Sequence, residues 1–288
     1  MDRDHSSSFA QVVERLNELS VRKAHDPFLD VRWDGPDAQL DPRDPRFALL
    51  PDHPLGATAW YAGLTPEARS RLGLELFAQS LRFGITLETT LSRGLLAFID
   101  HRPRGSQVSR YALHEVIEES RHSLMFQTFL ERAGCTTQPF GRFDTWVKGR
   151  VVALASRAPT MFFVYVLAGE IFVDDDNRRQ LRERSRLHPL VARMLQIHVT
   201  EEARHIRFAE RYLAEQLPEL GAVRRRWLRA IAPSILNGNA EVMLQPTAAL
   251  VRRFAIPRPV LREAFGPGSA HRARVRAVSA PILALLDA

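Results

Sequence analysis

Cysteine is almost missing from this chain of 288 residues. Cys135 stands alone, so no disulfide can form within the chain and no metal site can be built from several thiolates. This scarcity is typical of a reducing compartment, and we expect a cytoplasmic protein. The N-terminal residues MDRDHSSSFAQ lack the apolar segment of a secretion signal, and no apolar run is long enough to span a membrane.

Lysine is also scarce, because Lys23 and Lys148 are the only two. Arginine therefore provides most of the positive charge behind the net charge of +7 and the pI near 10.4. An excess of positive charge can indicate a nucleic-acid, membrane or anionic partner. The arginines are scattered, however, and no zinc-finger or RNA-binding signature accompanies them. We expect neither nucleic acid nor a membrane as partner.

Proline is unevenly distributed along the chain. Seven of the 18 prolines lie between Pro27 and Pro66, which predicts an irregular arm because proline breaks helix interiors. Beyond this arm, long windows lack proline, and apolar residues recur in them at helical spacing, as in Leu74, Phe77 and Leu81. No alternating strand pattern competes with this spacing.

The sequence therefore predicts an all-α protein with a four-helix bundle core and extra N- and C-terminal helices. We expect an N-terminal helix and a proline-rich arm in residues 1–65, and one helical-bundle domain in residues 66–288 with its core helices at about 66–216. The core helices are predicted near 66–100, 107–133, 158–174 and 188–216. Shorter helices are predicted near 9–24, at 142–155 and after 220.

Two short segments almost repeat each other, Glu118-Glu119-Ser120-Arg121-His122 and Glu201-Glu202-Ala203-Arg204-His205. In each segment a Glu and a His stand three residues apart, so on a helix both side chains leave the same face and can share one metal ion. A single Glu-x-x-His pair would be weak support, since charged neighbours are common on helix surfaces. The second copy makes a metal site much the better interpretation.

One isolated glutamate precedes each repeat, Glu88 in FGITLETTLSRGLL and Glu170 in VYVLAGEIFV. The interval from Glu88 to Glu119 and the interval from Glu170 to Glu202 differ by a single residue. Glu170 has no Lys or Arg within one helical turn, so a local ion pair cannot stabilise its buried charge, whereas a metal ion can. Four-helix carboxylate proteins hold two iron or manganese ions with this repeated pattern.

His198 adds a third histidine, four residues before Glu202, whereas the matching position of the first repeat is Glu115. This exception to the symmetry predicts two unequal metal ions. The predicted ligands are Glu88, Glu119, His122, Glu170, His198, Glu202 and His205. Mixed carboxylate and imidazole ligands suit Fe, with Mn also possible.

Four charged residues beside the ligands are predicted to support them: Glu118, Arg121, Glu201 and Arg204. A carboxylate that accepts the ring proton of a ligand histidine fixes its tautomer. Our hypothesis is a crossed arrangement in which Glu201 contacts His122 and Glu118 contacts His205. The alternative is that all four form a solvated charge network.

The ligand set resembles that of the ferritin-like diiron oxygenases typified by p-aminobenzoate N-oxygenase and the arylamine oxygenase of chloramphenicol biosynthesis. That family is distinguished by three histidines and four glutamates, and the resemblance covers roughly residues 66–216. It implies a ferritin-like bundle with two Fe ions, O₂ as co-substrate and an external electron donor or reductase. It also implies oxidation of a small-molecule amine to hydroxylamine, nitroso or nitro products in antibiotic biosynthesis, by a homodimer acting on a free or carrier-bound substrate.

Other functions of such a site stay open. Diiron hydroxylases that act on C–H bonds of another small substrate share the Glu-x-Arg-His motif but lack the third histidine. An iron-storage or iron-sensing protein could use the same ligands without a substrate pocket. A radical-storing reductase subunit loses support because Phe126, and not a tyrosine, lies four residues after His122.

The residues that share helix faces with the ligands predict a mostly apolar substrate pocket. They are Gly84, Ile85, Leu91, Phe163, Val166, Leu167, Val173, Asp174, Asn177 and Leu195. Gly84 leaves room where a substrate could approach. The polar run Asp174-Asp175-Asp176-Asn177 is interpreted first as a helix end, and second as groups that orient substrate or relay protons.

Overall fold

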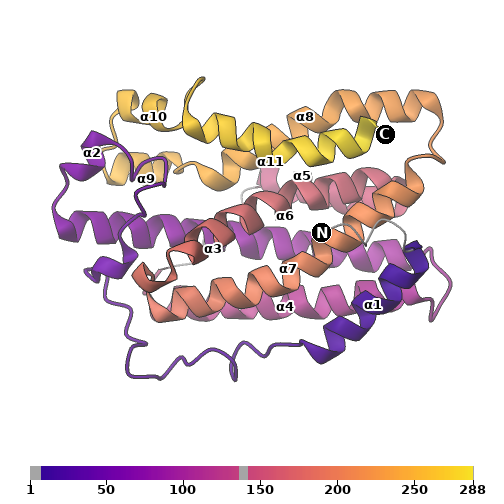
Figure 1. Ribbon diagram of the computed structural model, residues 1–288, viewed down its shortest axis with the longest axis horizontal. Helices are drawn as coiled ribbons and strands as arrows, with labels where there is room; N and C mark the ends of the chain where they lie inside the picture. The colour runs from indigo at the N-terminus through magenta and orange to yellow at the C-terminus, as the bar shows by residue number, and fades with distance from the viewer. Residues whose placement is uncertain (1–7, 136–141, 288) are drawn as a thin grey trace.

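The computed structural model describes residues 8–135 and 142–287. This part of the chain consists of helices, turns and irregular loops without any strand, so the predicted all-α class is confirmed. Four long helices form the core: α3 (Pro66–Ile99), α4 (Gln107–Arg132), α6 (Pro159–Arg182) and α7 (Pro189–Gln216). α3 packs along α4 and α6 packs along α7, and all four follow the long axis of the molecule (Figure 1).

The core helices begin where the local sequence signals a start. Thr65 and Ser106 cap α3 and α4 by accepting hydrogen bonds from backbone N–H groups of the first turn. His188 caps α7 in the same way. Proline occupies the first position of α3, α6 and α7, where its missing N–H would have no partner within the helix.

One boundary prediction was wrong. α6 was expected to end near residue 174, but it continues to Arg182, so the run Asp174-Asp175-Asp176-Asn177 lies inside the helix. The acidic side chains are paired with arginines: Arg178 Nε lies 2.6 Å from Asp174 Oδ2, and Arg179 pairs with Asp176 one turn away. These pairs offset the repulsion between adjacent carboxylates and let the helix continue.

The remaining elements surround the bundle. They are α1 (Phe9–Arg22), η1 (Pro45–Phe47), α2 (Ala59–Ala62), α5 (Arg142–Arg157), η2 (Arg184–Arg186), α8 (Ala222–Leu244), α9 (Ala248–Arg253), α10 (Arg258–Phe265) and α11 (Ala270–Asp287). α5 connects α4 to α6 and packs on α3 and α6, while α8 and α11 lie together over α6 (Figure 1).

The N-terminal arm follows the surface of the bundle. α1 packs on α4 and α7, and the irregular segment after it is held by arginines of those helices. Arg132 donates a hydrogen bond to the Trp33 carbonyl at 2.7 Å, and Arg193 donates one to the Asp30 carbonyl at 2.9 Å. The division between residues 1–65 and 66–288 stays a prediction, and the first seven residues lie outside the described part of the chain.

Two apolar clusters occupy the bundle on either side of its middle. One contains the fully buried aromatic residues Tyr111, Phe163, Phe208 and Tyr212. The other contains Phe129 and the apolar residues of the first turns of α7. The cluster around Tyr111 receives side chains from the first turns of α4 and from the last turns of α7. The two helices therefore run in opposite directions. The polar residues between the clusters are therefore enclosed from both ends.

None of the described helices combines the length and the apolar character needed to cross a bilayer.

Candidate metal centre

All predicted ligands meet in the middle of the bundle. α3 carries Glu88, α4 carries Glu119 and His122, α6 carries Glu170, and α7 carries His198, Glu202 and His205. Each is buried, with at most 2% of its surface exposed. The helical repeat therefore brings the side chains to one enclosed point, as the sequence spacing requires.

Potential ligand atoms form two groups that share no residue. In the first group, atoms of Glu88, His122, His198 and Glu202 lie within 4.8 Å of one another. In the second group, atoms of Glu115, Glu119 and His205 lie within the same distance. Each group combines the histidine of one Glu-x-x-His repeat with the glutamate of the other. The arrangement offers two adjacent positions for metal ions.

A third grouping connects these two positions. Atoms of Glu88, Glu119 and Glu170 also lie within 4.8 Å of one another, so Glu170 of α6 reaches the middle of the centre. Glu88 belongs to the first position and Glu119 to the second. Carboxylates placed in this way can contact both metal positions, since each offers two oxygens.

His122 presents its two ring nitrogens to different partners. Nδ1 lies 3.2 Å from Glu119 Oε2 and 3.3 Å from Glu202 Oε1, so it faces the predicted ligands. Nε2 lies 2.9 Å from Glu201 Oε2 on the outer side. When Nε2 donates its proton to Glu201, Nδ1 is left free to bind a metal ion.

His205 repeats this geometry across a pseudo-twofold axis. Nδ1 lies 3.1 Å from Glu119 Oε1 and from Glu202 Oε2, and Nε2 lies 2.8 Å from Glu118 Oε2. Both contacts of the crossed hypothesis are thus present, and both carboxylates are almost fully buried. The alternative of a solvated charge network does not describe Glu118 and Glu201.

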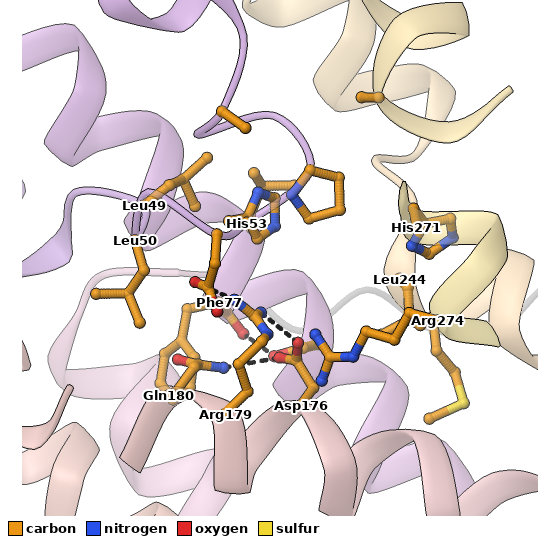
Figure 2. A pocket seen from close by; sticks show the side chains of 18 of the residues that line it. Leu49, Leu50, His53, Phe77, Asp176, Arg179, Gln180, Leu244, His271 and Arg274 are labelled. Carbon is orange, nitrogen blue, oxygen red and sulfur yellow. Dashed lines mark hydrogen bonds and ion pairs between the residues drawn. The ribbon is translucent and has the colours of Figure 1, made fainter. Parts of the chain in front are cut away.

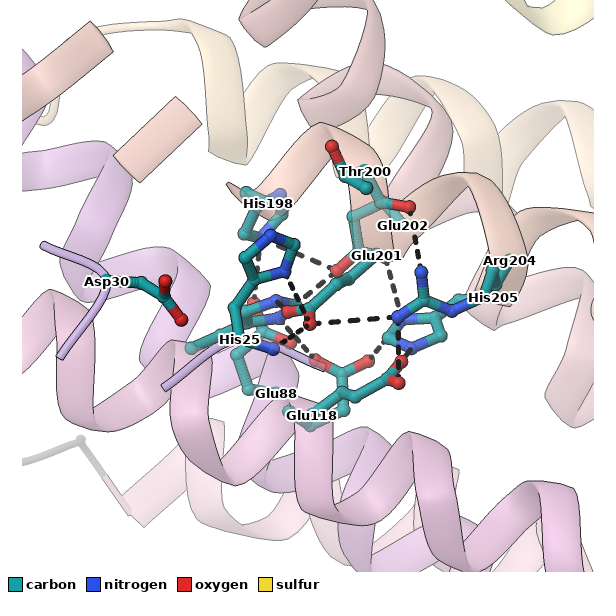
Figure 3. A network of polar contacts seen from close by, with 12 residues as sticks. His25, Asp30, Glu88, Glu118, His198, Thr200, Glu201, Glu202, Arg204 and His205 are labelled. Atoms are coloured by element: carbon teal, nitrogen blue, oxygen red, sulfur yellow. Dashed lines mark hydrogen bonds and ion pairs between the residues drawn. The ribbon is translucent and has the colours of Figure 1, made fainter. Parts of the chain in front are cut away.

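The two outer carboxylates differ in their next partner. Arg204 donates a hydrogen bond to Glu118 Oε1 at 2.8 Å and is itself buried. The matching Arg121 is only half-buried, and within residues 8–135 and 142–287 it makes no hydrogen bond or ion pair with the cluster. Glu201 instead contacts His25 of the N-terminal arm (Figure 3). The prediction that Arg121 supports a ligand is therefore not met by the geometry.

His25 is a residue near the centre that the sequence pattern could not identify. Its Nδ1 lies 3.2 Å from Glu201 Oε1, its backbone N–H donates to the same oxygen at 3.3 Å, and its side chain is 20% exposed. It comes from the irregular arm, where no periodicity relates it to the ligands. A connected path of polar groups therefore leads from the surface through His25 and Glu201 to His122.

His198 occupies the position that breaks the symmetry. Its Nε2 faces the centre, 3.4 Å from Glu88 Oε1, and its Nδ1 lies 3.3 Å from the amide Nδ2 of Asn177. The oxygen and nitrogen of an amide are assigned from the hydrogen-bond network, and rotation by half a turn exchanges them. With Oδ1 in that place, Asn177 accepts the Nδ1 proton and leaves Nε2 free for a metal ion.

The charge state of the cluster also fits a metal-binding site. Burial and the neighbouring carboxylates raise the pKa of Glu88 and of Glu170 well above the usual value. Burial lowers the pKa of His198 to about 4, so its ring is neutral as a ligand requires. Although burial opposes it, contact with Glu119 and other carboxylates raises the pKa of His122 to about 10. Protonated His122 carries a positive charge that compensates the carboxylates around it, and a bound metal ion would compensate them in the same way.

Unpartnered oxygens point to the same conclusion. Neither carboxylate oxygen of Glu170 has a hydrogen-bond partner among the described residues, although the side chain is fully buried. Such a group is costly to bury without a partner. Oxygen and imidazole donors without sulfur suit iron and manganese, so the residues present fit a pair of such ions.

A small cavity adjoins the centre, and a larger one lies next to it. The smaller, of about 50 Å³, is lined by Glu88 and His198 together with apolar residues of α3 and α8. The larger, of about 350 Å³, lies between α3, α6, α11 and the arm (Figure 2). The two share the wall residues Phe77, Ser80, Asp176, Met243 and Leu244. They therefore lie next to each other, and the smaller one reaches Glu88 and His198.

The larger cavity has a polar side. Arg179 donates a hydrogen bond to Asp52 at 2.7 Å, and Arg274 donates one to Asp175 at 2.6 Å. Burial lowers the pKa of His53 and of His271 to about 4, so both imidazoles are neutral near pH 7. These two arginines are thus paired with carboxylates, and the two neutral rings remain to contact a ligand.

The predicted pocket residues fall into two sets. Gly84, Val173, Asn177 and Leu195 line the smaller cavity. Leu91, Phe163, Val166 and Leu167 are buried in the apolar core, while Ile85 and Asp174 line neither cavity. A residue on the ligand face of a helix can pack against a neighbouring helix instead of a cavity, and the sequence does not distinguish the two.

Gly84 has a second structural role besides the predicted one. A Cβ atom at this position would lie 2.8 Å from Cε2 of Phe126, so the glycine makes room for that ring. The ring of Phe126 stacks on His198, with 5.4 Å between the ring centroids. Gly84 thus supports the position of a candidate ligand as well as lining the smaller cavity.

The fold and the site together define a class: a ferritin-like helical bundle with a buried carboxylate and histidine centre that can hold metal ions. Comparison with known proteins identifies the family. The family model of the p-aminobenzoate N-oxygenase AurF matches residues 6–288, so the chain belongs to the AurF family. The family resemblance recognised in the sequence is confirmed, and the match extends well beyond residues 66–216.

Relatives among curated proteins agree with this assignment without refining it. Uncharacterised proteins of Mycobacterium bovis and Mycobacterium tuberculosis are 36% identical to the chain over 265 residues. The aligned region covers 92% of this chain and 78% of each relative.

Proposed function

We propose that this protein is a diiron oxygenase that uses O₂ to N-oxygenate a small-molecule amine. The observation that carries the proposal is the enclosed centre of four glutamates and three histidines, with His198 as the third imidazole. Membership of the AurF family supports the same reaction. Antibiotic or other natural-product biosynthesis is the proposed setting.

Residues of the chain itself would prepare the centre for this chemistry. Two iron ions bound by the seven ligands would supply O₂ binding and reduction. Glu118 and Glu201 hold the ring protons of His205 and His122, so both histidines present Nδ1 inward. The apolar clusters above and below exclude water from the ligands.

The two cavities suggest how an amine would be placed. The smaller one is lined by Glu88 and His198, so an amino group there would lie beside the ligands. The body of the substrate would extend past Phe77 and Asp176 into the larger one, toward His53 and His271. A volume of about 350 Å³ accommodates a small organic molecule.

The proposed reaction also defines the partners. Each conversion of an N–H bond to N–OH consumes one O₂, two electrons and two protons and releases one water. Because no residue of the chain can supply two electrons repeatedly, an external electron donor or reductase is required. We propose in addition that the protein acts as a homodimer on a free or carrier-bound amine.

Reconstitution tests the proposal. Metal-free protein would be loaded anaerobically with Fe(II), and bound iron would be counted by elemental analysis, with two per chain expected. The loaded protein would then receive O₂, a chemical reductant and a panel of aryl and alkyl amines, and mass spectrometry would follow the gain of oxygen. Oxygen gain on carbon alone would indicate a C–H hydroxylase instead, and accumulation of many irons per chain would indicate storage.

A further inference from the structure

Glu115 is the most unusual buried side chain outside the predicted ligands. It lies on α4 one turn before Glu119, and only 1% of its surface is exposed. Neither of its carboxylate oxygens has a hydrogen-bond partner among the described residues. In that same part of the chain it forms no ion pair with an arginine, lysine or histidine.

A carboxyl group in this position lacks the usual means of stabilisation. Burying a carboxylate without a partner costs several kcal/mol, so such groups are normally paired or bound to a metal. No described group takes that role for Glu115, and a bound metal ion would supply the missing partner.

The position of Glu115 shows which ligand would fit. One of its oxygens lies within 4.8 Å of potential ligand atoms of Glu119 and His205. Since Nε2 of His205 is taken by Glu118, the atom of His205 that faces this group is Nδ1. The three side chains surround one side of the second metal position.

The pseudo-twofold axis relates Glu115 to His198. His198 precedes Glu202 by four residues on α7, and Glu115 precedes Glu119 by four residues on α4. Because α4 and α7 run in opposite directions, His198 lies level with His122 and Glu115 lies level with His205. Glu115 and His198 therefore occupy equivalent positions, one with a carboxylate and the other with an imidazole. The sequence showed this difference only as a break in the symmetry.

We propose that Glu115 is an eighth metal ligand, which binds the ion on the His205 side of the centre. The inference rests on the proposed metal centre and adds a ligand to it. The first ion then has two imidazoles, from His122 and His198, while the second has one imidazole and an additional carboxylate. Oxygen-rich sites favour harder ions such as Mn(II), so the two positions differ in metal preference.

The test compares metal binding by the wild-type protein and by Glu115→Gln. Glutamine keeps the shape of the side chain but removes the carboxylate. Mn(II) would be titrated into metal-free protein, with free Mn(II) followed by electron paramagnetic resonance and bound metal by elemental analysis. We expect two Mn(II) per wild-type chain, and in the variant at least tenfold weaker binding of one of them, since even residues behind a ligand change affinity about 10- to 100-fold.

Controls separate ligation from folding. Glu131→Gln removes an exposed carboxylate of the same helix and is expected to bind both ions as the wild type does. Glu115→Asp retains a carboxylate and should recover part of the lost affinity. Circular dichroism and thermal unfolding of the metal-free proteins would show that Glu115→Gln retains the fold, as expected when no hydrogen bond is removed.

The outcomes distinguish this inference from the proposed function. Two equally tight ions in Glu115→Gln would overturn the assignment of Glu115 and leave the seven-ligand centre intact. Failure of the wild-type protein to bind two ions would overturn the centre itself. A spectrum of a single uncoupled Mn(II) in the variant, against a coupled pair in the wild type, would confirm that one position has been lost.

Discussion

The unequal outer partners of the two histidines allow a sharp prediction about stability. Glu118→Gln should destabilise the metal-free protein more than Glu201→Gln does. Glu118 accepts a hydrogen bond from Arg204, whose guanidinium is always charged and only 4% exposed. Glu201 contacts His25, whose side chain is 20% exposed, so water can replace part of that contact.

The contacts set the size of the difference. Removing one partner of a buried ion pair costs about 3–5 kcal/mol. We expect about 3 kcal/mol for Glu118→Gln, because Arg204 keeps a second carboxylate, Glu201 Oε1, at 3.7 Å. For Glu201→Gln we expect about 1–2 kcal/mol, since the amide oxygen can still accept the backbone N–H of His25.

Thermal unfolding followed by circular dichroism measures both changes. An unfolding entropy of about 2.1 cal/mol/K per residue gives about 0.6 kcal/mol/K for this chain. The expected decreases in Tm are therefore about 5 °C for Glu118→Gln and about 2–3 °C for Glu201→Gln. The double variant Glu118→Gln/Arg204→Met removes the stranded charge and should recover part of the loss. Equal decreases, or no recovery, would refute the argument from charge.

Three further variants test individual contacts. His25→Ala removes the contact between the arm and Glu201 and should weaken Fe(II) binding about tenfold, measured by competition with a chelator. Unchanged binding would show that His25 does not support the metal centre. Asn177→Leu removes the group that accepts the Nδ1 proton of His198 and should also lower metal affinity about tenfold, whereas Asn177→Asp should keep the wild-type affinity. Equal metal affinities of the two variants would exclude this role of Asn177. Gly94→Ala would bring a Cβ into overlap with the ring of Phe162 and should lower stability by about 1–3 kcal/mol in urea unfolding. An unchanged midpoint would show that the ring can move.

The sequence identified the four core helices because their signals are local. Proline at the first helical position and capping residues such as Thr65 and Ser106 act within one turn. The end of α6 was missed for a reason that is partly local and partly tertiary. Asp174 and Asp176 are paired along the helix, but Asp175 is paired with Arg274 of α11, far along the chain.

The convergence of the seven candidate ligand side chains was predicted from the sequence because helical geometry fixes their relative directions. Residues three or four apart on one helix share a face, so two Glu-x-x-His repeats and His198 define inward stripes before any packing is known. The crossed contacts of Glu118 and Glu201 also follow from this symmetry. The regular geometry of a helix determines how its side chains are arranged, and all the candidate ligands lie on helices.

Only the tertiary structure decided which residues surround the ligands. His25 reaches Glu201 from an irregular arm that has no periodicity, and Arg121 is left aside although the repeat would have placed it opposite Arg204. The cavity walls also depend on contacts between helices far apart in sequence, so six of the ten predicted pocket residues line neither cavity. A sequence determines in which direction each side chain leaves its helix, but the packing of the helices determines which residue that side chain contacts. For the same reason, Glu115 becomes a candidate ligand only once it is seen beside His205.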